Sequence, residues 1–274
     1  MRHIDARGLT FDLYEGGPDD GDSVLLLHGF PQDHREFDLL APRLHEAGLK
    51  TYALNQRGTS PGARPSGVDA YRMTEAVADA VAVLDALGVQ KAHVIGHDWG
   101  AIVGWWLAAG HPERVRSLTA VSVPHPKALS LALRVRASQR ARMAYFKVFQ
   151  SPVAERLLLA GDGALLRGML KPIGARGIKY VEEMRDDPGR LTGGLNWYRA
   201  SPSGSPEGPG IVRVPTTYVW SDKDGVVSLT AALRTADWVE ADYQLVALRG
   251  VSHWIPEQAS GALADAALER IGRV

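Results

Sequence analysis

The chain has 274 residues, of which 45% are hydrophobic and 23% are charged, a composition typical of a globular protein rather than a fibre or a disordered chain. Its 31 basic and 31 acidic residues leave no net charge, which argues against a dedicated nucleic-acid-binding protein. The absence of cysteine excludes disulfides, thiolate nucleophiles and cysteine-ligated metal sites. We see no signal peptide and no apolar run of the roughly 18 residues that a membrane span needs, so we expect a soluble, cytoplasmic protein.

The first 123 residues predict strands that alternate with helices. Short alternating or continuous apolar runs predict strands at 10–14, 24–27, 51–54, 93–95 and 118–121. Apolar residues at three- and four-residue steps, and a small-residue segment rich in tryptophan, predict helices at 36–47, 71–87 and 99–109. This alternation predicts an α/β fold with a mostly parallel, twisted sheet and helices on both faces.

The alternation stops at residue 124 and resumes at residue 213. The segment 124–212 is too long for a plain loop and shows helical patterns, so we predict an inserted, mainly helical lid. The lid divides the core into a first part, 1–123, and a second part, 213–274. A turn-rich linker is expected at 201–210, followed by strands at 216–220 and 245–248 and helices at 228–237 and 257–271.

The segment Gly96-His97-Asp98-Trp99-Gly100 lies between a predicted buried strand and a predicted helix. Its spacing is that of the nucleophile elbow G-x-S-x-G, with Asp98 in place of the serine. Glycines allow a sharp turn that pushes the middle side chain into a cleft. The alternative is a glycine-bounded turn in which Asp98 only caps the helix.

Chain order supplies an acid and a histidine after Asp98. In this type of fold the acid follows a late strand and the histidine follows the last one. Asp224 and the alternative acid Asp222 both come directly after the strand at 216–220. His253 is the only histidine beyond them, and it follows the strand at 245–248. The sequence therefore predicts a triad of Asp98, His253 and one of the two acids.

A third motif, His28-Gly29-Phe30-Pro31, follows the first buried strand. The backbone N–H of Phe30 could pair with that of Trp99 to form an oxyanion hole. Taken alone, the motif is equally typical of an ordinary tight turn.

Together these segments resemble an α/β-hydrolase, and specifically the epoxide hydrolase family, the branch with an aspartate nucleophile. The resemblance covers the core motifs over nearly the whole chain, and it includes the segment Ser252-His253-Trp254. Two lid segments also match, 145–152 and 195–199, which resemble the segments that hold the two lid tyrosines of that family. The family pattern Trp-x-x-x-Asp, present here as Trp220 to Asp224, favours Asp224 over Asp222.

The resemblance implies a two-step reaction that opens an epoxide to a vicinal diol. A carboxylate is ionised at neutral pH, so Asp98 could attack a ring carbon and form an alkyl ester. Tyr145 and Tyr198 would donate a proton to the opening ring. His253, held by Asp224, would then activate a water that hydrolyses the ester.

The remaining expectations concern the ligand. We expect a small apolar epoxide and water as substrates, no cofactor, no metal and no nucleic acid, and a pocket lined by Phe30, Trp99, Phe149 and Trp254. No assembly signal indicates an oligomeric state. A basic cluster is interpreted as a solvated face of the lid, and it comprises Arg134, Arg136, Arg140 and Arg142.

Two other functions remain open. A haloalkane or haloacid dehalogenase could use the same aspartate, although those patterns favour asparagine at position 30 or arginine at position 99, where this chain has Phe30 and Trp99. A non-catalytic ligand-binding protein could use the same scaffold. Two departures from the epoxide hydrolase pattern, Ser252 before the histidine and Phe146 in the lid, bear on loop geometry and substrate preference.

Overall fold

The computed structural model describes residues 1–201 and 208–274, so that residues 202–207 of the predicted linker lie outside the described residues. The strands are β1 (Arg2–Ala6), β2 (Leu9–Gly16), β3 (Asp22–Leu27), β4 (Leu49–Leu54), β5 (Ala92–His97), β6 (Val115–Val121), β7 (Thr216–Ser221) and β8 (Tyr243–Leu248). The helices are α1 (Ala41–Glu46), α2 (Met73–Ala86), α3 (Trp99–Gly110), α4 (Pro126–Val135), α5 (Ala137–Arg142), α6 (Tyr145–Phe149), α7 (Ala154–Leu170), α8 (Gly174–Asp186), α9 (Pro188–Arg199), α10 (Leu229–Arg234), α11 (Ile255–Gln258) and α12 (Ser260–Ile271).

Within the described ranges the strands form one sheet in the order β1-β2-β4-β3-β5-β6-β7-β8. Strand β2 pairs antiparallel with β1 and with β4, and all other neighbours pair in parallel. The predicted mostly parallel sheet is therefore confirmed. In the register of the central strands, Leu27 of β3 lies opposite Gly96 of β5, so the turns that follow these two strands lie side by side.

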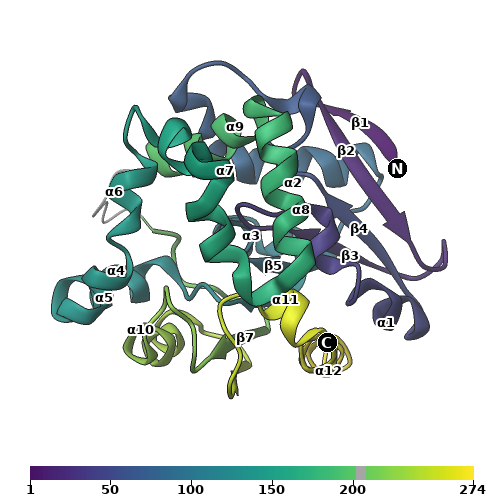
Figure 1. Cartoon of the computed structure of the whole chain (residues 1–274). Coiled ribbons are helices and arrows are strands. Elements are labelled where there is room, and N and C mark those ends of the chain that lie inside the picture. Colours follow the sequence, from purple (N-terminus) through teal and green to yellow (C-terminus); the bar gives the residue numbers. More distant parts are fainter. Residues whose placement is uncertain (202–207) are drawn as a thin grey trace.

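Strand β3 shows why helices cover both faces of the sheet (Figure 1). Its side chains alternate between two apolar clusters. Leu25 and Leu27 belong to the cluster that includes residues of α2 and α3, whereas Val24 and Leu26 belong to the one that includes residues of α1 and α12. A strand buried on both faces reads as a continuous apolar run, which is the pattern that predicted it.

Between β6 and β7 the described chain forms helices, α4 to α9, and no strand of the sheet. Helix α7 is interrupted by non-helical backbone at Ala160, Gly161, Asp162 and Gly163. Helices α7, α8 and α9 pack on one another, as Figure 1 shows. This is the helical insertion expected in the α/β-hydrolase fold. Among the helices of the described residues, none is long and apolar enough to cross a membrane.

One strand was not predicted, and some of the predicted helices are divided in the structure. Strand β1 was not expected, because only Ile4 and Ala6 of its residues are buried. The helix expected at 36–47 is a 3₁₀ turn, His34–Phe37, followed by the short α1, in whose first turn Pro42 lies. The helix expected at 257–271 is divided at Ala259, whose φ of −139° and ψ of 39° separate α11 from α12.

Candidate active site

Asp98 lies in the sharp turn between β5 and α3. Its φ of 51° and ψ of −115° belong to a region that residues with side chains rarely adopt, so the surroundings must hold the turn. A Cβ atom at Gly96 would lie 2.2 Å from the carbonyl oxygen of Gly100, and one at Gly100 would lie 1.9 Å from that of Leu27. Because both obstacles are backbone, the two glycines are what allows Asp98 to reach the end of β3.

Side chains that follow three different strands meet at this turn. His253 Nδ1 lies 2.9 Å from Asp224 Oδ2, and His253 Nε2 lies 3.4 Å from Asp98 Oδ2. The backbone N–H of Phe30 donates to Asp98 Oδ1 at 3.0 Å. The alternative acid, Asp222, is exposed and accepts a hydrogen bond from the loop after β8 instead. The structure thus brings together Phe30 and the three predicted triad residues, with Asp224 as the acid beside His253.

Opposite charges dominate the electrostatics of this group. Burial alone would raise the pKa of the Asp98 carboxyl, but the hydrogen bond and charge of His253 outweigh it and lower that pKa. Burial alone would lower the pKa of His253, but Asp224 and Asp98 outweigh it and raise that pKa. Both shifts favour an aspartate anion beside an imidazolium, so Asp98 is ionised in the resting protein.

The two predicted lid tyrosines approach the same place from different helices. Tyr145 begins α6 and Tyr198 lies near the end of α9, and their ring centroids are 6.2 Å apart. Burial, with the negative charge of Asp98, raises the pKa of each phenol well above its ordinary value. A hydrogen bond with the side chain of Trp99 partly offsets this increase at Tyr198. Both hydroxyls therefore stay protonated and within the electrostatic influence of Asp98.

Aromatic rings surround Tyr198. Four ring centroids lie 4.9 to 5.5 Å from its own, and they belong to Phe30, Trp99, Phe146 and Phe149. A cavity beside Phe30 and Trp99 measures about 20 Å³, which is space for about one water molecule. Neither Asp98 nor Tyr198 is among the residues that line this cavity.

Trp254 was also expected to line the pocket. In the structure its ring contacts the rings of His253 and His97. Its ring centroid is 5.2 Å from that of His253 and 6.2 Å from that of His97. Its indole N–H donates to the backbone carbonyl of Met169 at 3.0 Å. Trp254 thus packs against the histidine and joins it to α7, apart from the rings around Tyr198.

Sequence patterns did not identify the groups that hold the backbone of His253 in place. Glu36 is fully buried, and its Oε2 atom lies 3.0 Å from His97 Nδ1. Burial raises the pKa of Glu36 well above its ordinary value and lowers that of His97 to about 4, so both groups are neutral. His97 Nε2 and the hydroxyl of Ser122 both contact the His253 carbonyl oxygen, at 3.0 and 2.7 Å. Glu36 carried no signal, because its burial arises only in the folded protein.

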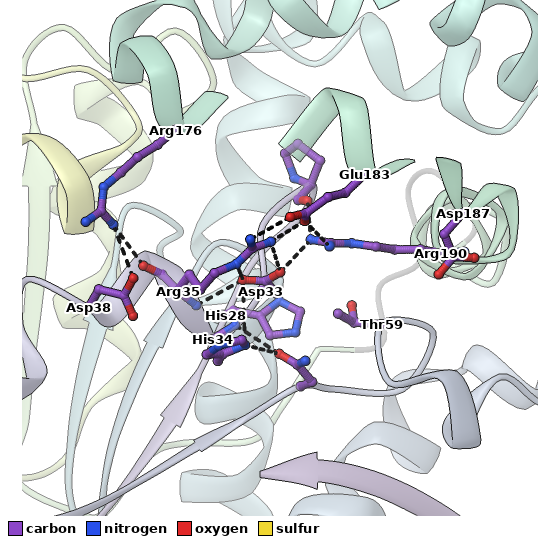
Figure 2. Close-up of polar contacts among 12 residues, drawn as sticks. His28, Asp33, His34, Arg35, Asp38, Thr59, Arg176, Glu183, Asp187 and Arg190 are labelled. Carbon is purple, nitrogen blue, oxygen red and sulfur yellow. Dashed lines mark hydrogen bonds and ion pairs between the residues drawn. The ribbon is translucent and has the colours of Figure 1, made fainter. Parts of the chain in front are cut away.

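A second group of charges joins the core to the helical insertion, and we call it the core–insertion ion network: Asp33, Arg35, Glu183 and Arg190 (Figure 2). Asp33 and Arg35 lie shortly after the turn that carries Phe30, whereas Glu183 is on α8 and Arg190 on α9. Arg190 is 2.9 Å from Asp33 and 3.0 Å from Glu183, and Arg35 also contacts both acids.

In the part of the chain that the structure describes, no group of three or more His, Asp or Glu side chains could hold a metal ion.

The sheet order, the helical insertion and the elbow define an α/β-hydrolase fold. A family model described as alpha/beta hydrolase fold matches residues 22–260. The AB hydrolase superfamily protein YfhM of Bacillus subtilis (strain 168) is 32% identical over 92% of this chain and 91% of its own length. The chain belongs to the alpha/beta hydrolase fold family.

Epoxide hydrolases are among its relatives, as the sequence motifs suggested. Epoxide hydrolase A of Mycobacterium tuberculosis is 28% identical over 98% of this chain and 96% of its own length. A Bacillus megaterium epoxide hydrolase, solved in complex with an inhibitor, matches 99% of this chain and 100% of its own with a TM-score of 0.90. Its sequence identity is 21%, so this likeness bears on the fold alone.

Proposed function

We propose that this chain is an epoxide hydrolase, which converts a small apolar epoxide and water into a vicinal diol. The observation that carries the proposal is the position of Asp98, an ionised carboxylate with the His253–Asp224 pair beside it and the charge of its carboxylate acting on Tyr145 and Tyr198. The full-length similarity to a protein named epoxide hydrolase A supports it. In this proposal residues 124–212 act as a lid over the core.

Ring opening would be the first step. One Asp98 carboxylate oxygen attacks a ring carbon and forms a C–O ester bond, while the bond from that carbon to the epoxide oxygen breaks. The leaving oxygen takes a proton from Tyr145 or Tyr198. Two phenols are suited to this step because they remain protonated at neutral pH, and an alkoxide is basic enough to deprotonate them.

Ester hydrolysis would be the second step. Formation of the ester removes the charge of Asp98, and with it part of what keeps His253 protonated. The imidazolium then gives its proton to the phenolate left by ring opening, which restores the tyrosine. Neutral His253 then takes a proton from water, whose oxygen attacks the Asp98 carboxyl carbon. The N–H groups of Phe30 and Trp99 stabilise the resulting oxyanion. As the oxyanion collapses, the bond from the carboxyl carbon to the ester oxygen breaks, and that oxygen takes the proton from His253 to complete the diol. The Asp98 carboxyl then returns its proton to His253, which restores the carboxylate and the imidazolium.

The first test is to trap the ester with His253→Gln. We expect this variant to gain the mass of one whole epoxide molecule, with the adduct on Asp98, while ester hydrolysis slows by about 10²- to 10⁴-fold because the base is gone. Intact mass spectrometry after exposure to epoxides and haloalkanes measures the adduct. A gain of a haloalkane minus hydrogen halide would assign the protein to the dehalogenases, and no adduct with any compound would favour a binding protein.

The second test concerns the proton donors. We expect Tyr145→Phe combined with Tyr198→Phe to slow ester formation by about 10²- to 10⁴-fold, because no acid remains to protonate the leaving oxygen. Rapid-quench measurement of ester formation is the assay, and Tyr52→Phe on β4 is the matched control. Ester formation at the unchanged rate in the double variant would refute this role of the lid tyrosines.

A further inference from the structure

The loop that carries Asp224 is held by the lid as well as by the core. Gln139, on α5, is fully buried. Its side-chain N–H donates to the Val226 carbonyl at 2.8 Å, and its side-chain oxygen accepts from the Ser228 N–H at 2.9 Å. One carboxamide thus satisfies a carbonyl and an N–H two residues apart, as a paired strand would.

A second residue of α5 forms a hydrogen bond with the same loop. The guanidinium of Arg142 donates to the backbone carbonyl of Asp224. Arg142 is exposed, as expected for a solvated face of the lid, and its guanidinium also contacts the Asp224 loop. Two residues of one lid helix therefore bind the loop at Asp224, Val226 and Ser228.

Inside the loop, backbone groups set the direction of the Asp224 carboxylate. Asp224 Oδ1 accepts from the N–H of Val226 at 2.6 Å and from that of Val227 at 2.9 Å. These two bonds leave Oδ2 to face His253 Nδ1. Val226 is held on both sides, since its N–H binds Asp224 and its carbonyl binds Gln139.

The same segment of the lid continues into α6, which begins with Tyr145. We infer that Gln139 is a positioning residue, which sets the orientation of the Asp224 carboxylate toward His253. One lid segment then fixes both the proton donor for ring opening and the acid that supports the base for ester hydrolysis. The inference rests on the proposed function and adds to it a residue that couples the two half-reactions.

Gln139→Met tests the inference, because methionine is similar in length and lacks both hydrogen bonds. We expect ester hydrolysis to slow about tenfold through misalignment of the acid, with ester formation changed less than about twofold. Rapid-quench intact-mass measurements follow both steps. Arg142→Met removes a single contact of an exposed residue, and we expect a smaller loss in the same step. Ser138→Ala, exposed on the same helix, is the matched control.

The pH dependence of ester hydrolysis distinguishes a displaced Asp224 from a general loosening of the lid, because only the former should change the pKa of His253. The titratable groups that act on His253 are Asp98, Asp224, His97 and Glu36. A displaced Asp224 would stabilise the imidazolium less, so the pKa of His253 should fall. The acidic limb of ester hydrolysis should then move to lower pH in Gln139→Met, and NMR titration of His253 should show the same shift without any substrate.

Four outcomes separate the possibilities. Slower hydrolysis together with a lower His253 pKa supports the inference. Unchanged hydrolysis and an unchanged titration in both α5 variants would overturn it, as would an equal slowing of both steps with no change in pKa. If no epoxide forms an adduct even with His253→Gln, the proposed function fails, and the NMR titration alone decides whether Gln139 positions Asp224.

Discussion

Asp98→Ala should lower diol formation by about 10⁴-fold or more, because it removes the carboxylate proposed to form the ester. Aspartate already carries the strain of this positive φ, and alanine also has a Cβ, so the substitution adds little strain and should leave the protein folded. Steady-state diol formation, measured by mass spectrometry of the product, is the assay. Appreciable diol formation by the purified variant would contradict the nucleophile assignment.

Asp222→Ala is the matched control for the acid side of the site. It removes an exposed carboxylate only two residues from Asp224, and we expect most of the activity to remain. Asp224→Ala should by contrast lose ester hydrolysis while still forming the ester, because the acid acts through His253. If both variants lost ester hydrolysis equally, the loss would come from disturbing the loop and not from removing the contact between Asp224 and His253.

Arg190→Met should destabilise the fold by about 3 kcal/mol, because it removes one cation from a buried ion network and leaves its acids short of a partner. The side chains of Arg190 and Asp33 are 9% and 4% exposed, so water can replace little of what is lost. Urea unfolding measures the free energy. Arg176→Met is the control: that side chain is 36% exposed and lies 3.8 Å from Asp38 (Figure 2). A loss of about 1 kcal/mol or less is expected there.

The effect of Arg190 should also depend on pH. Burial alone would raise the pKa of Asp33, but Arg35 and Arg190 outweigh it and hold that pKa well below its ordinary value. A depressed pKa in the folded state adds stability at neutral pH, and this stability is lost as pH falls below the unfolded value of about 4. The difference in unfolding free energy between Arg190→Met and the unaltered protein should therefore shrink as pH is lowered through this range. An unchanged difference at acidic pH would show that packing, rather than the ion network, is what Arg190 contributes.

The sheet could be predicted because its strands carry local signals. The apolar run at 24–27 is buried on both faces and reads as a strand without any knowledge of its neighbours. Strand β1 carries only two inward side chains, Ile4 and Ala6, and its pairing with β2 is what identifies it. The helix expected at 36–47 was too long, since periodicity alone does not reveal that the 3₁₀ turn there serves to bury Glu36.

The candidate site likewise has a part that local sequence signals predict and a part that depends on contacts between distant segments. Asp98 and His253 follow from a short motif and from the order of strands, because parallel strands bring their carboxyl ends to one edge. Gln139 and Ser228 are 89 residues apart in the chain, and nothing near either one predicts their contact. Arg190 and Asp33 meet only because α9 packs over the turn after β3. Contacts made by the helical insertion are thus the part that a single sequence does not predict.

The position of β8 at the edge of the sheet bears on how firmly His253 is held. Among the described residues this strand pairs only with β7 and is for the most part half-exposed, so it opens more easily than the central strands. Yet the carbonyl of His253, which follows β8, is held by Ser122 and His97 from the ends of β6 and β5. The backbone at His253 is thereby held to the middle of the sheet, so local opening of β8 should leave the imidazole in place.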